Sequence, residues 1–104
     1  MPPEEPAMPP PTASLQHTIV RTLDAEATAR LLSEVAGLRI GKIWHNFLPL
    51  STSNSVALDL LQVESPSTAA SSPPSISPQH YAFLTDDSGF DAGLRALKSR
   101  KIEF

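Results

Sequence analysis

The chain has 104 residues, a formal net charge of −3 and no cysteine. This length allows one small domain, and an acidic balance without a basic cluster gives nucleic-acid binding no electrostatic support. The lack of cysteine excludes disulfides, thiolate metal ligands and a cysteine nucleophile, and no apolar run has the length of a membrane span or a secretory signal. We therefore expect a cytoplasmic protein that binds neither nucleic acid nor a membrane.

Two stretches are too poor in large apolar side chains to pack. Residues 1–14 are dominated by proline and by small or acidic residues, and we expect a disordered tail. Residues 65–79 are rich in serine, proline and alanine, which indicates a loop. Roughly 75 residues are left for a core, near the lower limit for a single hydrophobic core.

The first regular elements are a strand and a helix. Alternation over Leu15–Val20 predicts a strand in which Gln16 and His17 point to opposite faces. Asp24 is a typical helix N-cap, apolar residues then recur at helical spacing, and Gly37 stands where a C-terminal glycine is expected. An amphipathic helix is therefore predicted between these two residues.

Three further strands are predicted, at 38–44, 47–52 and 55–64. Pro49 in the second of them indicates an edge strand or a bulge. Asp59 stands among the apolar residues of the third, where a carboxylate is costly unless it is paired, hydrogen-bonded or bound to a metal. His45 falls in the loop before Phe47, where we expect it to be exposed.

The strand–helix pattern then occurs a second time. Residues 79–85 read as a strand, and Asp86 and Asp87 are helix caps before an apolar stripe that ends near Arg100. Residues 102–104 alternate like the start of another strand. Sliding the chain along itself places Gln16 on Gln79 and His17 on His80. Each predicted first strand therefore carries a histidine at the same place, as expected of a repeated supersecondary unit.

This order of elements resembles the vicinal oxygen chelate superfamily, which includes glyoxalase I, extradiol dioxygenases and the fosfomycin- and bleomycin-resistance proteins. The resemblance lies in QHTIV, DAEATARLLSEVAGLRIG, SVALDLL and QHYAFLTDDSGFDAGLRALKSRKIEF. It implies an α+β fold of βαβββ modules around a metal-lined cleft. The first module would span residues 15–64, and a truncated second module would span residues 80–104.

The superfamily takes its metal ligands from the first and last strands of each module. The resemblance therefore implies that His17, His80 and Asp59 bind a divalent metal together with a small oxygen-chelating substrate. Two imidazoles and a carboxylate admit Fe, Zn, Mn or Ni. The acidic ligand of the second module has no counterpart in the sequence, so Asp59 would have to complete the set.

Three functions are compatible with these residues. The first is a metal-dependent enzyme of the lyase, dioxygenase or thiol-transferase class. The second is a non-catalytic binding protein of the bleomycin-resistance type, whose ligand binding would survive a chelator. The third is an inactive truncated fragment, which a homodimer formed by module pairing could complete.

Overall fold

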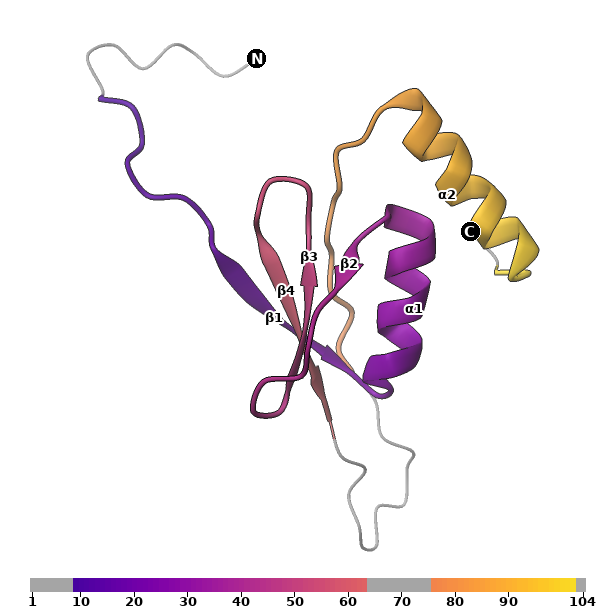
Figure 1. Ribbon diagram of the computed structural model, residues 1–104, viewed down its shortest axis with the longest axis horizontal. Helices are drawn as coiled ribbons and strands as arrows, with labels where there is room; N and C mark the ends of the chain where they lie inside the picture. Colours follow the sequence, from indigo (N-terminus) through magenta and orange to yellow (C-terminus); the bar gives the residue numbers. More distant parts are fainter. Residues whose placement is uncertain (1–8, 64–75, 103–104) are drawn as a thin grey trace, which may run out of the picture.

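A computed structural model describes residues 9–63 and 76–102. Its elements are β1 (His17–Thr22), α1 (Ala25–Ala36), β2 (Arg39–Ile40), β3 (Phe47–Ser51), β4 (Ala57–Gln62) and α2 (Asp87–Ser99). The strands form one four-stranded sheet in the order β1-β4-β3-β2, with β1 parallel to β4 and the other pairs antiparallel (Figure 1). The α+β class and the βαβββ order of the first module are therefore as predicted.

Parts of the sequence-based predictions lie outside the described residues. The structure describes only the last six residues of the predicted tail over 1–14, and only the end of the predicted loop over 65–79. Of the strand start predicted at 102–104, only Ile102 is described, and it is not in a strand. The boundaries drawn between tail, modules and loop remain predictions.

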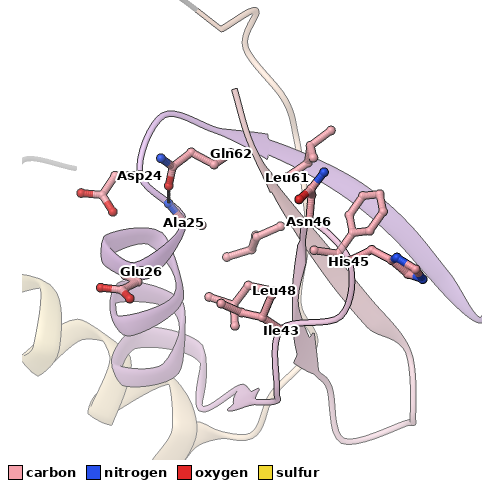
Figure 2. Close-up of a pocket in the computed structure, with 11 residues that line it drawn as sticks. Asp24, Ala25, Glu26, Ile43, His45, Asn46, Leu48, Leu61 and Gln62 are labelled. Atoms are coloured by element: carbon pink, nitrogen blue, oxygen red, sulfur yellow. Dashed lines mark hydrogen bonds between the residues drawn. The ribbon is translucent and has the colours of Figure 1, made fainter. Parts of the chain in front are cut away.

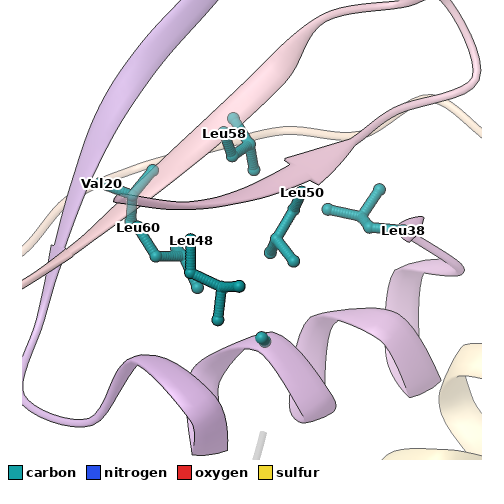
Figure 3. Packing of buried hydrophobic residues seen from close by; sticks show 7 residues of the cluster. Val20, Leu38, Leu48, Leu50, Leu58 and Leu60 are labelled. Atoms are coloured by element: carbon teal, nitrogen blue, oxygen red, sulfur yellow. The ribbon is translucent and has the colours of Figure 1, made fainter. Parts of the chain in front are cut away.

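The hydrophobic core lies between the sheet and α1 (Figure 3). The buried apolar residues come from every strand except β2, from α1 and from the turn that follows it: Val20, Ala29, Leu38, Leu48, Leu50, Leu58 and Leu60. Leu50 and Leu60 are completely buried. Because side chains alternate along a strand, burying every second residue of β3 and β4 against α1 turns the residues between them to the opposite face. We call that opposite side the helix-free face.

The ends of α1 follow the predicted signals. The Asp24 carboxylate accepts a hydrogen bond from the Ala27 backbone N–H at 3.1 Å, as an N-cap residue does. Gly37 ends the helix with φ of 70°, a left-handed conformation that glycine adopts without a Cβ clash. The Gln62 Oε1 atom accepts from the Ala25 N–H at 3.1 Å, so the end of β4 helps to hold the start of α1.

The second strand is much shorter than predicted, and the third is not at an edge. Of residues 38–44, only Arg39–Ile40 form a strand; Trp44 makes a single bridge with Phe47, and His45, with φ of 54°, lies in the turn between them. Pro49 lies in an inner strand. This is tolerated because its backbone points toward β2, where only its carbonyl is needed, to accept from the Gly41 N–H at 2.8 Å.

The strand predicted at 79–85 is not formed. This segment contacts the outer edge of β1 through side chains: Gln79 Nε2 donates to the Arg21 carbonyl at 3.2 Å, and the Tyr81 hydroxyl donates to the Ile19 carbonyl at 3.4 Å. Side chains of this length hold the two backbones too far apart for a ladder. Pro78, just before the segment, also has no N–H to donate. The segment therefore runs beside β1, with Gln79 opposite Arg21 and Tyr81 opposite Ile19, without joining the sheet.

The predicted second helix is present and packs on the side of α1 away from the sheet (Figure 1). Asp86 caps it by accepting from the Gly89 N–H at 2.8 Å and from the Ser88 hydroxyl at 2.9 Å, and these bonds hold the pKa of its carboxyl below the ordinary value. At the other end, Arg100 Nε donates to the Glu34 carboxylate of α1 at 2.6 Å. The helix is thus attached to the first module through α1.

Candidate functional site

His17 opens β1 on the helix-free face. The buried residues of this strand are Val20 and Thr22, which point toward α1. His17 and Ile19 alternate with them and are exposed on the other side. The sequence placed the strand two residues earlier, but it placed His17 on the face opposite Val20, as observed.

Asp59 lies on the same face, on the neighbouring strand. Leu58 and Leu60 on either side of it are buried against α1, so the Asp59 side chain points away from the core and is half-buried. In the parallel pairing of β1 with β4, His17 is opposite Ala57 and Ile19 is opposite Asp59. His17 and Asp59 are therefore diagonal neighbours, at a spacing that long side chains can bridge.

His80 lies in the segment that follows the outer edge of β1. It stands between Gln79 and Tyr81, whose side chains make the contacts to that edge, and it is exposed. Over the part of the chain that the structure describes, no group of three or more His, Asp or Glu side chains is close enough to hold a metal ion. The fold brings His17 and Asp59 to one face but does not gather them with His80, and their role as a ligand set remains a prediction.

Gln16 takes a position that alternation along the chain did not predict. Its Oε1 atom is 3.1 Å from Nδ1 of His17, although neighbouring residues of a strand should point to opposite faces. The reason is that β1 begins only at His17, so the Gln16 side chain is not bound by the pleat. A polar residue directly before the first residue of a strand is a local signal that would have suggested this contact.

A cavity of about 640 Å³ lies elsewhere, between the start of α1 and the loop that leads into β3 (Figure 2). Leu48 and Leu60 form its floor on the core side, and Glu26 and His45 stand at its border. His45 was expected only to be exposed; in addition, its ring packs edge-on against Trp44 at 4.0 Å. At the start of α1, the N–H groups of Ala25 and Ala27 are bonded by the side chains of Gln62 and Asp24, and the carboxylates of Asp24 and Glu26 make this helix start unfavourable for an anion.

No protein-family model and no curated protein matches the chain. Solved structures do. Oxidase ChaP-H2 is 33% identical with a TM-score of 0.73, and oxidase ChaP-H1 is 35% identical with a TM-score of 0.70. Each match covers 86% of this chain and 64% of the oxidase. Lactoylglutathione lyase from Agrobacterium tumefaciens is 17% identical with a TM-score of 0.58, over 91% of this chain and 75% of the lyase.

These likenesses and the βαβββ topology define the class: the chain has the fold of the vicinal oxygen chelate superfamily, as the sequence predicted. It is identical to the ChaP oxidases at about a third of the matched positions, and it spans 64% of their length. Neither helix in the described part of the chain is long and apolar enough to cross a bilayer.

Proposed function

We propose that this protein binds a divalent metal and a small oxygen-chelating substrate on the helix-free face of its sheet. The observation that carries the proposal is the placement of His17 and Asp59 on that face, on adjacent strands of a vicinal oxygen chelate fold. His80 is the ligand that the proposal adds, from the segment beside β1.

The donor set suits such an ion. Imidazole is a good ligand for Fe, Zn and Ni, and a carboxylate supplies negative charge and suits Mn as well. A metal bound there would supply Lewis acidity to the two substrate oxygens that chelate it. The chain's own part is to present His17 as a neutral nitrogen donor and Asp59 as a charged oxygen donor. Ile19 lies directly beside Asp59 and gives the site an apolar neighbour.

Among the reaction classes, oxidation of the substrate is the best supported. The two structures with at least 33% identity are called oxidases, whereas the lyase, at 17% identity, supports the fold alone. An oxidation favours a redox-active ion such as Fe or Mn, because Zn²⁺ has no redox chemistry. We infer that the reaction is an oxidation and not an isomerisation.

The second candidate is a binding protein without a catalytic metal. The observation that favours it is that the described residues do not gather three metal ligands. In this case a ligand would bind to the same face, and a chelator would not weaken its binding. In either function, a second chain could pair along the outer edge of β1 by displacing the side chains of Gln79 and Tyr81, which donate to the Arg21 and Ile19 carbonyls there.

The test is a titration with Co²⁺ alone, followed by its visible absorption, on the wild type and on the variants His17→Ala and Asp59→Ala. His45→Ala is the matched control, because it removes an exposed imidazole from the loop before β3, which carries none of the three proposed ligands. The proposal predicts saturable binding of one ion per chain, weakened at least about tenfold by either site variant and unchanged in the control. No saturable binding, or equal losses in all three variants, would contradict it.

A further inference from the structure

We propose that Gln16 is a positioning residue for His17. Its carboxamide holds the ring with the proton on Nδ1, so that Nε2 keeps the lone pair with which it can bind a metal. The value of this arrangement for metal binding rests on the function proposed above, whereas the tautomer itself does not.

The geometry of the contact determines where the proton lies. The atom that faces Nδ1 of His17, at 3.1 Å, is the carboxamide oxygen of Gln16. This oxygen can only accept a hydrogen bond, so the ring nitrogen must donate. A neutral imidazole has a single N–H, and Nε2 is therefore left as the acceptor. A histidine that binds metal through one nitrogen commonly donates from the other to an oxygen in this way.

The backbone of Gln16 is well placed to support this contact. Its carbonyl accepts a hydrogen bond from the Ala57 N–H at 2.8 Å, which fixes the residue against the start of β4. Ala57 is also the residue opposite His17 in the sheet. The backbones of both members of the Gln-His pair are therefore held by the same neighbouring strand, and only their two side chains have to be ordered for the bond to form.

The second Gln-His pair is used differently, and this contrast argues against a contact that forms wherever the two residue types are adjacent. Gln79 Nε2 donates to the Arg21 carbonyl at 3.2 Å, and Gln79 Oε1, at 3.1 Å, shares the single Tyr81 hydroxyl proton with the Ile19 carbonyl, at 3.4 Å. One end of the carboxamide thus attaches the segment to the edge of β1, and the other end is bonded to Tyr81 within the segment. Gln16 therefore contacts its neighbouring histidine, whereas Gln79 attaches the segment at 79–85 to the edge of β1.

The first experiment measures the tautomer in the metal-free protein. Long-range ¹H–¹⁵N correlation spectra, recorded at a pH where the rings are neutral, distinguish Nδ1–H from Nε2–H for each histidine. We expect Nδ1–H for His17 in the wild type, a shift toward Nε2–H in Gln16→Ala, and Nδ1–H again in Gln16→Glu, whose carboxylate also accepts. Gln79→Ala is the matched control and should leave His17 unchanged. Nε2–H in the wild type, or no response to Gln16→Ala, would overturn the proposal.

The second experiment measures the consequence for metal binding, again with Co²⁺ alone. Loss of a residue that orients a ligand typically weakens metal binding about 10- to 100-fold. Because Gln16 and His17 are both exposed, we expect the lower end of that range for Gln16→Ala, recovery in Gln16→Glu, and no change in Gln79→Ala. A changed tautomer with unchanged affinity would overturn the positioning role. If the wild type binds no Co²⁺, the proposed function fails, while the spectra still decide whether Gln16 sets the tautomer.

Discussion

The contact between the two helices depends on a glycine, and replacing it gives a sharp test of how α2 is attached. Gly93 is buried in α2, and a Cβ added there would lie 2.5 Å from the backbone oxygen of Val35 in α1. Ordinary van der Waals packing needs about 3.5 Å. Because a backbone oxygen cannot rotate away, α2 would have to retreat by roughly 1 Å, which would also strain the 2.6 Å ion pair between Arg100 and Glu34.

Two opposing effects determine whether Gly93→Ala raises or lowers the free energy of unfolding. Alanine is favoured over glycine inside a helix by about 0.8–1.0 kcal/mol, whereas forcing an extra methyl group into a packed contact costs about 1–3 kcal/mol. We expect the packing term to win, with a net loss of about 1 kcal/mol in the free energy of unfolding. Urea unfolding followed by circular dichroism measures the loss, and amide exchange should show that protection falls mainly in α2.

Gly89→Ala is the matched control in the same helix. A Cβ there meets the hydroxyl of the Thr85 side chain, which can rotate, and no backbone atom among its nearest contacts. The gain in helix propensity should then dominate, so the control should be neutral or slightly stabilised. If Gly93→Ala instead stabilises the protein by about the helix-propensity term of 1 kcal/mol, the helices do not pack as closely as described, and the reasoning is refuted.

Two further predictions concern the core and the pH dependence of the helix contact. Leu60→Ala removes a completely buried side chain and should cost about 2–5 kcal/mol in urea unfolding, whereas Ile43→Ala, at a side chain that is 68% exposed, should change stability by about 0.5 kcal/mol or less; similar losses in both would contradict the assigned core. The hydrogen bond from Arg100 holds the pKa of the Glu34 carboxyl below its ordinary value, so its contribution to stability is present above the ordinary pKa of glutamate and is lost as the pH falls through the lowered one. The free energy of unfolding, measured by urea denaturation over the acidic range, should therefore fall more steeply with decreasing pH for the wild type than for Glu34→Gln. Identical slopes for the two proteins would show that the ion pair is not formed in solution.

The parts of the fold that local chemistry determines could be predicted from the sequence. Both ends of α1 are correct because an N-cap carboxylate at Asp24 and a left-handed glycine at Gly37 act within one turn of the helix. The two faces of β4 were predicted correctly because side chains alternate along a strand, so burying Leu58 and Leu60 determines the face of every other residue. The alternation alone placed Asp59 on the face opposite Leu58 and Leu60, and the structure shows that this is the face away from the helix.

The errors arose where tertiary contacts decide whether a segment pairs. The strand predicted at 38–44 pairs only at Arg39–Ile40 and, through a single bridge, at Trp44. The alternation of residues 79–85 is typical of a strand. In the structure, however, the side chains of Gln79 and Tyr81, and not the backbone of this segment, bond to the edge carbonyls of β1. Tertiary contacts of this kind override local propensity.

The candidate site was predicted in part. Sequence and resemblance selected His17, Asp59 and His80, and the fold places the first two on one face; whether the three bind one metal remains a prediction. Gln16 was missed because the alternation rule was applied one residue before the strand begins.

The most direct test of the account is to map a bound ion by the broadening of NMR signals with Mn²⁺, whose paramagnetism acts on nearby nuclei. We expect substoichiometric Mn²⁺ to broaden the amide signals of His17 and Asp59 first, and His17→Ala to abolish this effect. Within the described residues, two carboxylates, those of Asp24 and Glu26, line the cavity at the start of α1. If broadening begins there, or if it is unchanged in His17→Ala, the metal site is not on the helix-free face and the proposed function is contradicted.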